Sequence, residues 1–346
     1  LPMQPPISLK AFPENFFAET ANYIANVQCP DGSIPWFRDG PMDPWDHIEA
    51  LMGLAIGGKH EQAKKGFDWL KENQQKNGSW LAAYRDGRIE DGTRAETNYV
   101  AYIATGVWHF HLVTGDKNFL TEMWDSVSRA IDFVLELQGS NGEIFWCLDT
   151  KKGVQYDCLL TGCSSIYKSL ECAIAIGSAL KKNTETWSMA RNRLGIAIST
   201  PPECFDQTWT SKDRYAMDWF YPVLTGVIRD KEALKRINKR WDEFVETGLG
   251  CRCVSDQPWI TVAETCELVL ALNCIGDRKR AATLFNWLNR FREKDGSYWT
   301  GYVFPEKVLW PEERPTWTAG AILLAADALI MKTKGSNLFS YWTTMS

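Results

Sequence analysis

The sequence predicts an all-α protein in which six helical hairpins close into one (α/α)6 toroid, a single domain over residues 1–346. Two observations lead to this prediction. Amphipathic segments alternate along the chain with apolar segments rich in small residues, and both have helical spacing. A short glycine turn also recurs after the amphipathic segments, and such a repeated unit determines the architecture. A closed ring of twelve helices accounts for a length above the usual size of one domain.

The recurring turn begins where a helix ends in Gln or Arg, and a Gly follows four residues later. Asp or Asn precedes each Gly, which favours the left-handed backbone that ends a helix and reverses the chain. The fourth and fifth hairpins lack a clean copy, so helical periodicity alone supports the ring there. The copies are Gln28 to Gly32, Gln74 to Gly78, Gln138 to Gly142 and Arg292 to Gly296.

The predicted helices alternate between an outer and an inner layer. Several inner helices begin with recognised signals, such as Asp43 before Pro44 and Pro315 before Thr316. An open solenoid would need polar capping repeats, whereas the last inner helix is as apolar as the middle ones. The outer helices are predicted at 13–28, 60–74, 117–138, 185–198, 230–246 and 278–292, and the inner ones at 44–57, 94–113, 162–180, 214–228, 261–275 and 315–331.

Composition excludes several classes of partner. The net charge is -5 with scattered Lys and Arg, so we expect no binding to nucleic acid or anionic lipid. The mean hydropathy is -0.29, and no apolar run approaches the ~18 residues of a membrane span. The ten cysteines are spread through predicted helices, which favours reduced thiols. With no signal peptide visible in the first residues, we expect a soluble cytoplasmic protein.

The segment from Lys64 to Trp80, KKGFDWLKENQQKNGSW, carries the clearest family likeness. It resembles the Gln-Trp repeat of squalene and oxidosqualene cyclases and of protein prenyltransferase β-subunits. The whole chain is similar to bacterial prenyltransferase-like proteins that carry such repeats. This resemblance implies a helical toroid and an isoprenoid substrate.

Two other segments resemble a different group. They are the stretch from Tyr99 to Leu137 followed by NGEIFW, and RPTWTAG at Arg314 to Gly320. Both are similar to six-hairpin glycosidases of the glucoamylase type. This resemblance implies the same toroid but a sugar substrate.

The motifs of isoprenoid chemistry are missing. Neither the Asp-x-Asp-Asp acid motif of squalene cyclases nor an Asp-Asp-x-x-Asp cluster for diphosphate ionisation occurs. The zinc site of protein prenyltransferases includes a downstream His, but all four histidines here precede residue 112. His109 and His111, two residues apart, face different sides of a helix and are not expected to share a metal. We therefore predict neither a metal site nor a cofactor.

Carboxylates near the starts of the inner helices are the candidate catalytic residues, because a toroid places its pocket at that end. Acid–base chemistry at neutral pH needs two carboxyl groups whose environments separate their pKa values. Residues three apart share a helix face, so the paired acids should point the same way. The alternative for each is a helix cap or a complement to the helix dipole. The candidates are Asp46, Glu49, Glu96, Asp218, Glu264 and Glu267.

Aromatic residues in the turns and at the inner helix starts are the candidate substrate contacts. Aromatic faces can stack on sugar rings or stabilise cations along an isoprenoid. We expect Arg252 to pair either with an anionic substrate group or with Asp256. The tryptophans of the outer helices are expected only to pack between helices. The predicted substrate-binding residues are Trp36, Trp45, His47, Tyr99, Trp219, Tyr221, Arg252, Trp259, Trp299 and Trp317.

Three functions remain compatible with these residues. The first is hydrolysis of a glycoside or oligosaccharide by paired carboxylates in a Trp-lined central pocket. The second is cyclisation or transfer of an isoprenoid by a non-standard acid. The third is binding of a small ligand without catalysis.

Overall fold

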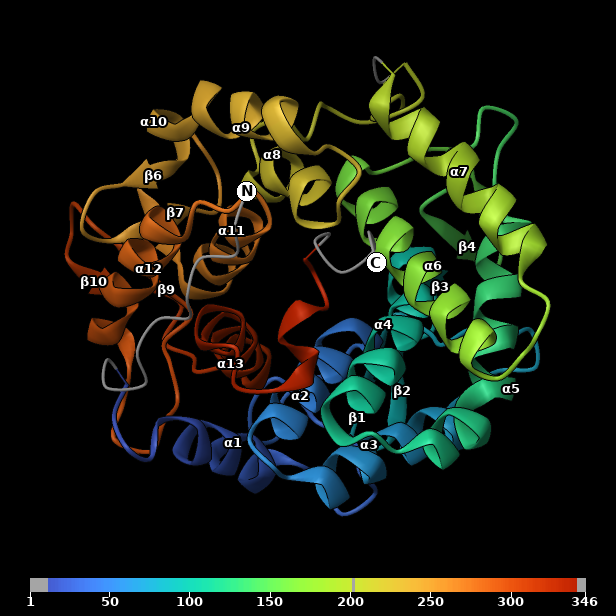
Figure 1. The fold of residues 1–346 in the computed structure, drawn as a ribbon, viewed down its shortest axis with the longest axis horizontal. Helices are drawn as coiled ribbons and strands as arrows, with labels where there is room; N and C mark the ends of the chain where they lie inside the picture. Colours follow the sequence, from blue (N-terminus) through green and yellow to red (C-terminus); the bar gives the residue numbers. More distant parts are fainter. Residues whose placement is uncertain (1–11, 201–202, 341–346) are drawn as a thin grey trace.

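The structure is a computed structural model that describes residues 12–200 and 203–340. Its α-helices form two concentric layers around one axis (Figure 1). The N-terminal segment in which no signal peptide was recognised lies largely outside the described residues. The outer helices are α1 (Phe16–Val27), α3 (His60–Asn73), α5 (Lys117–Glu136), α7 (Glu185–Ser199), α9 (Asp230–Lys239) and α12 (Arg278–Trp287). The inner helices are α2 (Pro44–Ile56), α4 (Thr97–Thr114), α6 (Leu160–Ala179), α8 (Ala216–Leu224), α11 (Val262–Cys274) and α13 (Thr316–Ile330).

The inner helices close into a ring. Each contacts the next along the chain, and α13 returns to pack against α2. The apolar character of these helices follows from their enclosure, since every residue of α13 except Trp317 is buried. The prediction of an all-α toroid built from six hairpins is confirmed.

Three of the differences between the predicted and observed helix bounds have a clear local cause. Residues 94–96 form the short strand β3 (Arg94–Glu96), because their backbone pairs with β4 (Cys147–Asp149). The outer helix predicted at 230–246 is interrupted after Lys239 and continues as the short α10 (Trp241–Phe244). The helix α8 ends at Leu224, and Gly226 in the left-handed region turns the chain away.

Three small antiparallel sheets lie at the end of the ring where the inner helices begin, and they were not predicted from the sequence. The first pairs β1 (Ala83–Arg85) with β2 (Arg88–Asp91), and the second has the order β3, β4, β5 (Gly153–Gln155). The third has five strands in the order β10 (Val308–Leu309), β9 (Gly301–Val303), β8 (Trp259–Thr261), β7 (Gly250–Arg252) and β6 (Val245–Glu246).

The repeated Gln joins neighbouring hairpins. The side-chain amide of Gln74 donates to the carbonyl oxygens of Gly78 in its own turn (2.8 Å) and of Ser126 in the next outer helix (2.9 Å). Gln28 and Gln138 make the corresponding two bonds, one to the Gly of their own turn and one to the next outer helix. The repeat is therefore a structural joint between hairpins rather than part of a substrate site.

The glycine of each turn permits close contact with the next helix. A Cβ atom on Gly78 would lie 2.2 Å from the carbonyl oxygen of Arg129, and one on Gly32 would lie 2.2 Å from that of Lys65. Both glycines also have positive φ, which other residues rarely adopt. This position must be glycine for two independent reasons.

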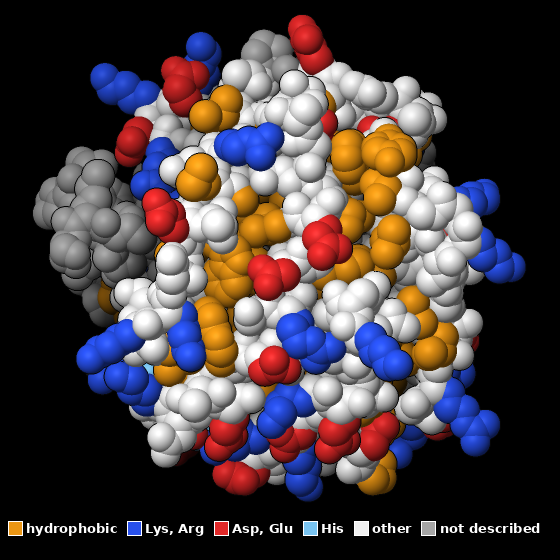
Figure 2. Space-filling view, turned by 90° about the vertical axis from the view of Figure 1, so that its right-hand side faces the viewer, with side chains coloured by type: hydrophobic (Ala, Val, Ile, Leu, Met, Phe, Trp, Pro, Cys, Tyr) orange, Lys and Arg blue, Asp and Glu red, His pale blue; other side chains and the backbone are white. Residues whose placement is uncertain are grey.

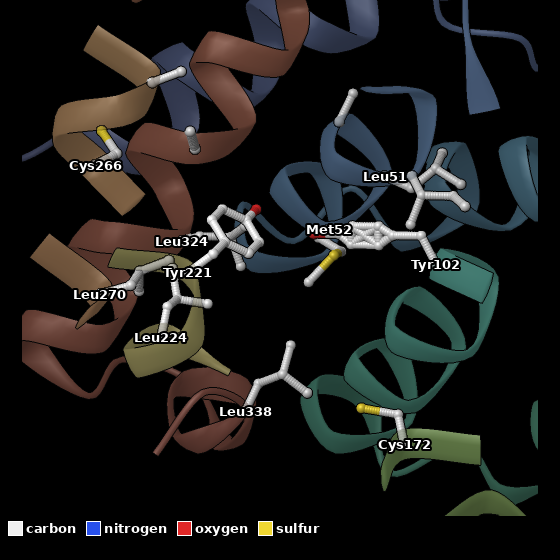
Figure 3. Close-up of a cluster of buried hydrophobic side chains, with 14 of the residues drawn as sticks. Leu51, Met52, Tyr102, Cys172, Tyr221, Leu224, Cys266, Leu270, Leu324 and Leu338 are labelled. Carbon is white, nitrogen blue, oxygen red and sulfur yellow. The ribbon is translucent and has the colours of Figure 1, made fainter. Parts of the chain in front are cut away.

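Apolar side chains fill the centre of the ring (Figure 3). Figure 3 shows Tyr102 of α4 and Tyr221 of α8 extending toward each other across this centre. Leu338, from the segment after α13, joins the cluster, and its carbonyl oxygen accepts a hydrogen bond from Lys168 Nζ (3.2 Å). The C-terminal segment thus covers the end of the ring at which the inner helices finish.

The outer surface carries both signs of charge. On the face in Figure 2, Lys and Arg side chains are interspersed with Asp and Glu and with apolar patches. Within the described residues, no helix combines the length and hydropathy that a membrane span requires. All ten cysteines lie in the described ranges and are free thiols.

Candidate active site

Four acids from two inner helices form a cluster that we call the acidic centre. Asp46 and Glu49 lie on α2, Glu264 and Glu267 lie on α11, and α13 packs between these helices. Besides burial and Asp43, the charges of Glu49 and Glu267 raise the pKa of Asp46. Besides burial, those of Glu49 and Glu264 raise the pKa of Glu267. The two predicted pairs at spacing three therefore face the same region.

The acidic centre has an accessible layer and a buried layer. Asp46 and Glu264, in the first turns of their helices, are partly exposed. Glu49 and Glu267 lie one turn deeper, with only 3% and 6% of their surface exposed. A ligand that approaches from the end of the ring where the inner helices begin contacts Asp46 and Glu264 first.

Asp46 does not cap α2, although the sequence left that role open. Asp43 caps α2 instead, since its Oδ1 accepts the backbone N–H of Asp46 (2.9 Å) and its Oδ2 accepts the indole N–H of Trp36 (2.9 Å). Burial, followed by the neighbouring charge of Asp43, raises the pKa of Asp46 well above its ordinary value. The environment thus favours a protonated Asp46 that can donate a proton.

Glu264 is likewise not held by the predicted capping box. Thr261 precedes α11 but makes no side-chain cap hydrogen bond. The thiol of Cys253 lies 3.8 Å from Glu264 Oε1, and the buried Oε2 has no hydrogen-bond partner. Burial raises the pKa of Glu264, while the nearby Thr261 hydroxyl, the backbone N–H of Glu264 and the Cys253 thiol lower it. One oxygen of this carboxyl group therefore keeps an unused hydrogen-bonding capacity.

The buried layer is closed by two tyrosines. The hydroxyl of Tyr102 donates to Glu49 Oε2 at 2.5 Å, and burial raises the pKa of Glu49 to about 7. Tyr221 faces Glu267, whose pKa burial raises well above its ordinary value. Burial thus shifts both acids toward the neutral form, which reduces the negative charge below Asp46 and Glu264.

Unpaired polar atoms gather around the acidic centre. A buried polar atom without a partner costs roughly 1–3 kcal/mol, so several in one region point to groups that a polar ligand would pair. Among the described residues, the buried unpaired atoms in or near the first turns of α2, α4, α11 and α13 are Trp45 Nε1, Asn98 Oδ1, Thr261 Oγ1, Glu264 Oε2, Glu267 Oε2, Trp317 Nε1 and Thr318 Oγ1.

Glu96 and Tyr99 lie at the start of α4, beside the acidic centre. Glu96 pairs with Arg94 (3.0 Å), whose guanidinium lies over the Trp146 ring at 5.7 Å. Burial raises the pKa of Tyr99, and the charges of Asp43, Glu96 and Asp46 act in the same direction. The ion pair gives Glu96 a structural partner that Asp46 and Glu264 lack.

Asp218 stands apart from the other acids. Burial raises its pKa to about 6, and the charges that affect it come from Arg236, Asp206, Asp213 and Arg240. None of these residues belongs to the acidic centre. The structure therefore does not bring Asp218 together with the acids of α2 and α11.

His47 and Trp219 are packing residues, which corrects the expectation that they bind substrate. His47 is fully buried, accepts the N–H of Ile34 at Nδ1 (3.1 Å) and lies 2.9 Å from the Gly66 oxygen through Nε2. Trp219 is 1% exposed and stacks on Phe244 at 4.8 Å. These side chains lie against the outer layer, where a ligand cannot reach them.

The other predicted aromatic residues lie in two zones. Trp36, Trp45, Tyr221 and Trp317 surround the acidic centre, and Trp45 packs on the Tyr102 ring at 4.2 Å. Trp259 and Trp299 lie farther out, on β8 and in the last repeated turn.

Arg252 and Trp299 are rim residues. Arg252 pairs with Glu246 (3.2 Å) and lies over the Phe304 ring, whereas Asp256 pairs with Arg214 (2.9 Å). The expected pair of Arg252 with Asp256 is therefore wrong. Trp299 lines a groove of about 620 Å³ beside α1.

Sequence reasoning missed three residues of the site. Asp43 was recognised as a cap, but its effect on the pKa of Asp46 was not. Asn98, in the first turn of α4, and Cys253, directly after the three-residue strand β7, belong to no recognisable motif. Within the described parts of the chain, no group of three His, Cys, Asp or Glu side chains could hold a metal ion.

Solved structures share the fold. A structure described as "Glycosidase Wild Type" covers 95% of this chain and all of its own, with a TM-score of 0.70 and 14% identity. A D-mannose isomerase covers 90% of this chain and 95% of its own, with a TM-score of 0.65 and 12% identity. At these identities the likeness shows the toroid and no more.

A curated protein is much more similar in sequence. It is the "MMP endo-(1,4)-3-O-methyl-alpha-D-mannosidase" of Mycolicibacterium hassiacum (strain DSM 44199 / CIP 105218 / JCM 12690 / 3849). It is 48% identical over 321 residues, which cover 93% of this chain and 88% of the relative. No protein-family model matches the chain. The relative supports the glycosidase-type resemblance and gives the isoprenoid alternative no support.

Proposed function

We propose that this chain, which belongs to the family of the MMP endo-(1,4)-3-O-methyl-α-D-mannosidase, hydrolyses internal (1,4) bonds between 3-O-methyl-α-D-mannose units. The observation that carries the proposal is the pair of partly exposed acids, Asp46 and Glu264, at the starts of two inner helices. Glycoside hydrolysis commonly uses two such carboxyl groups on either side of the scissile bond. The 48% identity supports the substrate class.

In this proposal Asp46 is the general acid. Burial and the charge of Asp43 raise the pKa of Asp46 well above its ordinary value, which favours the protonated form that a general acid requires. The proton passes from Asp46 to the glycosidic oxygen as the bond to the anomeric carbon breaks. Asp43, held by the Trp36 indole, fixes the helix end that presents Asp46.

Glu264 is the carboxylate partner on the other side of the bond. The Cys253 thiol, a weak donor, lies 3.8 Å from its Oε1, and its Oε2 has no hydrogen-bond partner among the described residues, so the carboxylate can act at the reacting centre. In this role it acts on the anomeric carbon either through a water molecule or directly, and the anomer of the product distinguishes these courses.

Trp45, Trp317 and Asn98 supply the sugar contacts. Their unpaired polar atoms match the hydroxyl groups of a sugar, and the indole rings offer apolar faces to its C–H groups. The Trp-lined pocket therefore remains part of the proposal. A single domain over residues 1–346 and a bacterial, cytoplasmic location also stay predictions.

Product analysis tests the proposal. The protein is incubated with a 3-O-methyl-α-(1,4)-mannan fragment, and new reducing ends and product lengths are followed by mass spectrometry. We expect shorter oligosaccharides of intermediate length, as internal cleavage requires. A helical, folded protein that releases none from this substrate contradicts the proposal, and a parallel panel of prenyl diphosphates tests the isoprenoid alternative.

A further inference from the structure

One face of the five-stranded sheet carries a row of apolar side chains. Trp259 of β8 is paired with Val303 of β9, and Val303 is paired with Val308 of β10. Directly paired residues project from the same face of a sheet. Trp310, two residues after Val308, lies opposite Gly301 and donates its N–H to the Gly301 oxygen (3.0 Å). We call Trp259, Val303, Val308 and Trp310 the tryptophan face.

Gly301 shapes this face. A Cβ atom there would lie 2.5 Å from Trp259 Nε1, so the indole can lie across the strand only because position 301 is Gly. Trp259 Nε1 donates to the Trp310 oxygen (2.8 Å), and the two rings meet edge to face at 5.2 Å. The two tryptophans therefore hold each other in a defined arrangement.

The tryptophan face begins next to the acidic centre. Cys253 donates its backbone N–H to the Trp259 oxygen (3.3 Å), and its thiol lies 3.8 Å from Glu264 Oε1. One residue thus links the proposed catalytic carboxylate to the start of the row. The row then runs outward along β8, β9 and β10, which Figure 1 places at the left of the ring.

The outer end of the row is open to solvent, while the opposite face of the sheet is not. Val308 and Trp310 are 47% and 55% exposed. On the other face, Ile260 is buried and Tyr302 and Leu309 pack against the core. The exposed residues are therefore not needed to fill the core. Because the other end of their row is joined to Glu264 through Trp259 and Cys253, the row points to a ligand that also reaches the acidic centre.

We propose that the tryptophan face is a distal subsite that binds an O-methylated sugar unit of a glycan whose cleaved bond lies at Asp46 and Glu264. This inference rests on the proposed function. An internal bond has sugar units on both sides, so the chain must extend beyond the acidic centre. A methyl ether replaces a hydroxyl group with an apolar one, and two valines beside two indoles suit it better than they suit an unmodified sugar.

Trp310→Ala tests the subsite. Steady-state kinetics compare long and short 3-O-methyl-mannose oligosaccharides with unmethylated oligosaccharides of equal length. We expect kcat/KM on the long methylated substrate to fall about five- to tenfold, as for loss of one aromatic contact, with no change on the shortest cleaved substrate. Trp310→Phe should retain most of the activity. Met189→Ala, an exposed residue of α7, is the control and should change neither.

The outcomes separate the subsite from the proposed function. Equal effects of Trp310→Ala on long and short substrates, or none on either, overturn the subsite. If the unaltered protein cleaves no glycan, the proposed function fails, and calorimetric titration with the long methylated oligosaccharide then decides the subsite. Binding that weakens in Trp310→Ala but not in Met189→Ala supports the subsite. Equal affinities of Trp310→Ala and the unaltered protein, or no binding by either, overturn it.

Discussion

Gly296, in the last repeated turn, lies directly against Glu19 in the first helix of the ring. A Cβ atom at position 296 would come within 2.5 Å of the Glu19 carbonyl carbon. Arg292 of the same turn donates to Glu19 Oε2 (2.9 Å) and to Thr20 Oγ1 (2.9 Å), so it takes the place that Gln has in the other copies. The joint that links successive hairpins also closes the ring.

We expect Gly296→Ala to destabilise the protein far more than Gly115→Ala does. Both glycines have positive φ, so both variants carry the strain of a left-handed residue, about 1–2 kcal/mol. Only position 296 adds a clash with backbone, since nothing lies within 4 Å of a Cβ atom at position 115. In urea unfolding, Gly296→Ala should therefore lose about 2 kcal/mol or more of unfolding free energy beyond the loss in Gly115→Ala. Equal losses would show that the last turn does not lock the ring.

Glu49→Gln should make stability less dependent on pH. The pKa of Glu49 rises from 4.5 to about 7 on folding, so the folded state binds this proton more tightly than the unfolded state does. Its contribution is fully present below pH 4.5 and is lost as the pH rises to about 7. An amide cannot titrate, so the variant should gain stability relative to the unaltered protein over this range, by on the order of 3 kcal/mol.

The measurement is thermal or urea unfolding of both proteins at several pH values between 4.5 and 7.5. Glu61→Gln, an exposed position of α3, controls for the loss of one carboxyl group. A stability difference between Glu49→Gln and the unaltered protein that stays constant with pH would exclude a proton held at Glu49.

Cys253→Ala should shift the acidic limb of the pH–activity profile to higher pH. The hydrogen bond from the thiol lowers the pKa of Glu264, so its removal lets burial raise that pKa further. Cys253→Ser keeps a hydroxyl donor and should return the limb toward its original position. A profile that is the same in all three proteins would separate Cys253 from the function of Glu264.

The activity of the unaltered protein should follow a bell-shaped pH profile. Activity rises as Glu264 loses its proton and falls as Asp46 loses its own at higher pH. Because burial and Asp43 raise the pKa of Asp46, the descending limb should lie well above the ordinary range of a carboxyl group. A descending limb in the ordinary range of an aspartic acid would contradict the role of Asp46 as acid.

The fold was predictable because its two signals are long-range and repetitive. Helical periodicity identified the helices, and the Gln and Gly positions of the turn recur because each copy makes the same contacts with the next helix. The strands were not predictable, since segments such as β9 and β10 are two or three residues long and show no alternation.

The acids of the site were only partly predictable. Spacing of three placed Asp46 with Glu49 and Glu264 with Glu267, but spacing does not tell which member is exposed. It also does not tell which side of a first turn faces inward, so His47 and Trp219 were expected at the site although they pack in the wall. That distinction depends on how the helices are rotated in the ring.

The most direct test of the proposed function compares kcat for Asp46→Asn and Glu264→Gln with that for Asp218→Asn on a 3-O-methyl-α-(1,4)-mannose oligosaccharide. We predict a loss of about a hundred- to ten-thousandfold for each of the first two, with unfolding midpoints maintained, because each removes one carboxyl group of the reacting pair. Asp218→Asn should stay within about tenfold of the unaltered protein, since its acid lies outside the acidic centre. Near-normal turnover in a folded Asp46→Asn or Glu264→Gln variant would contradict the proposed pair.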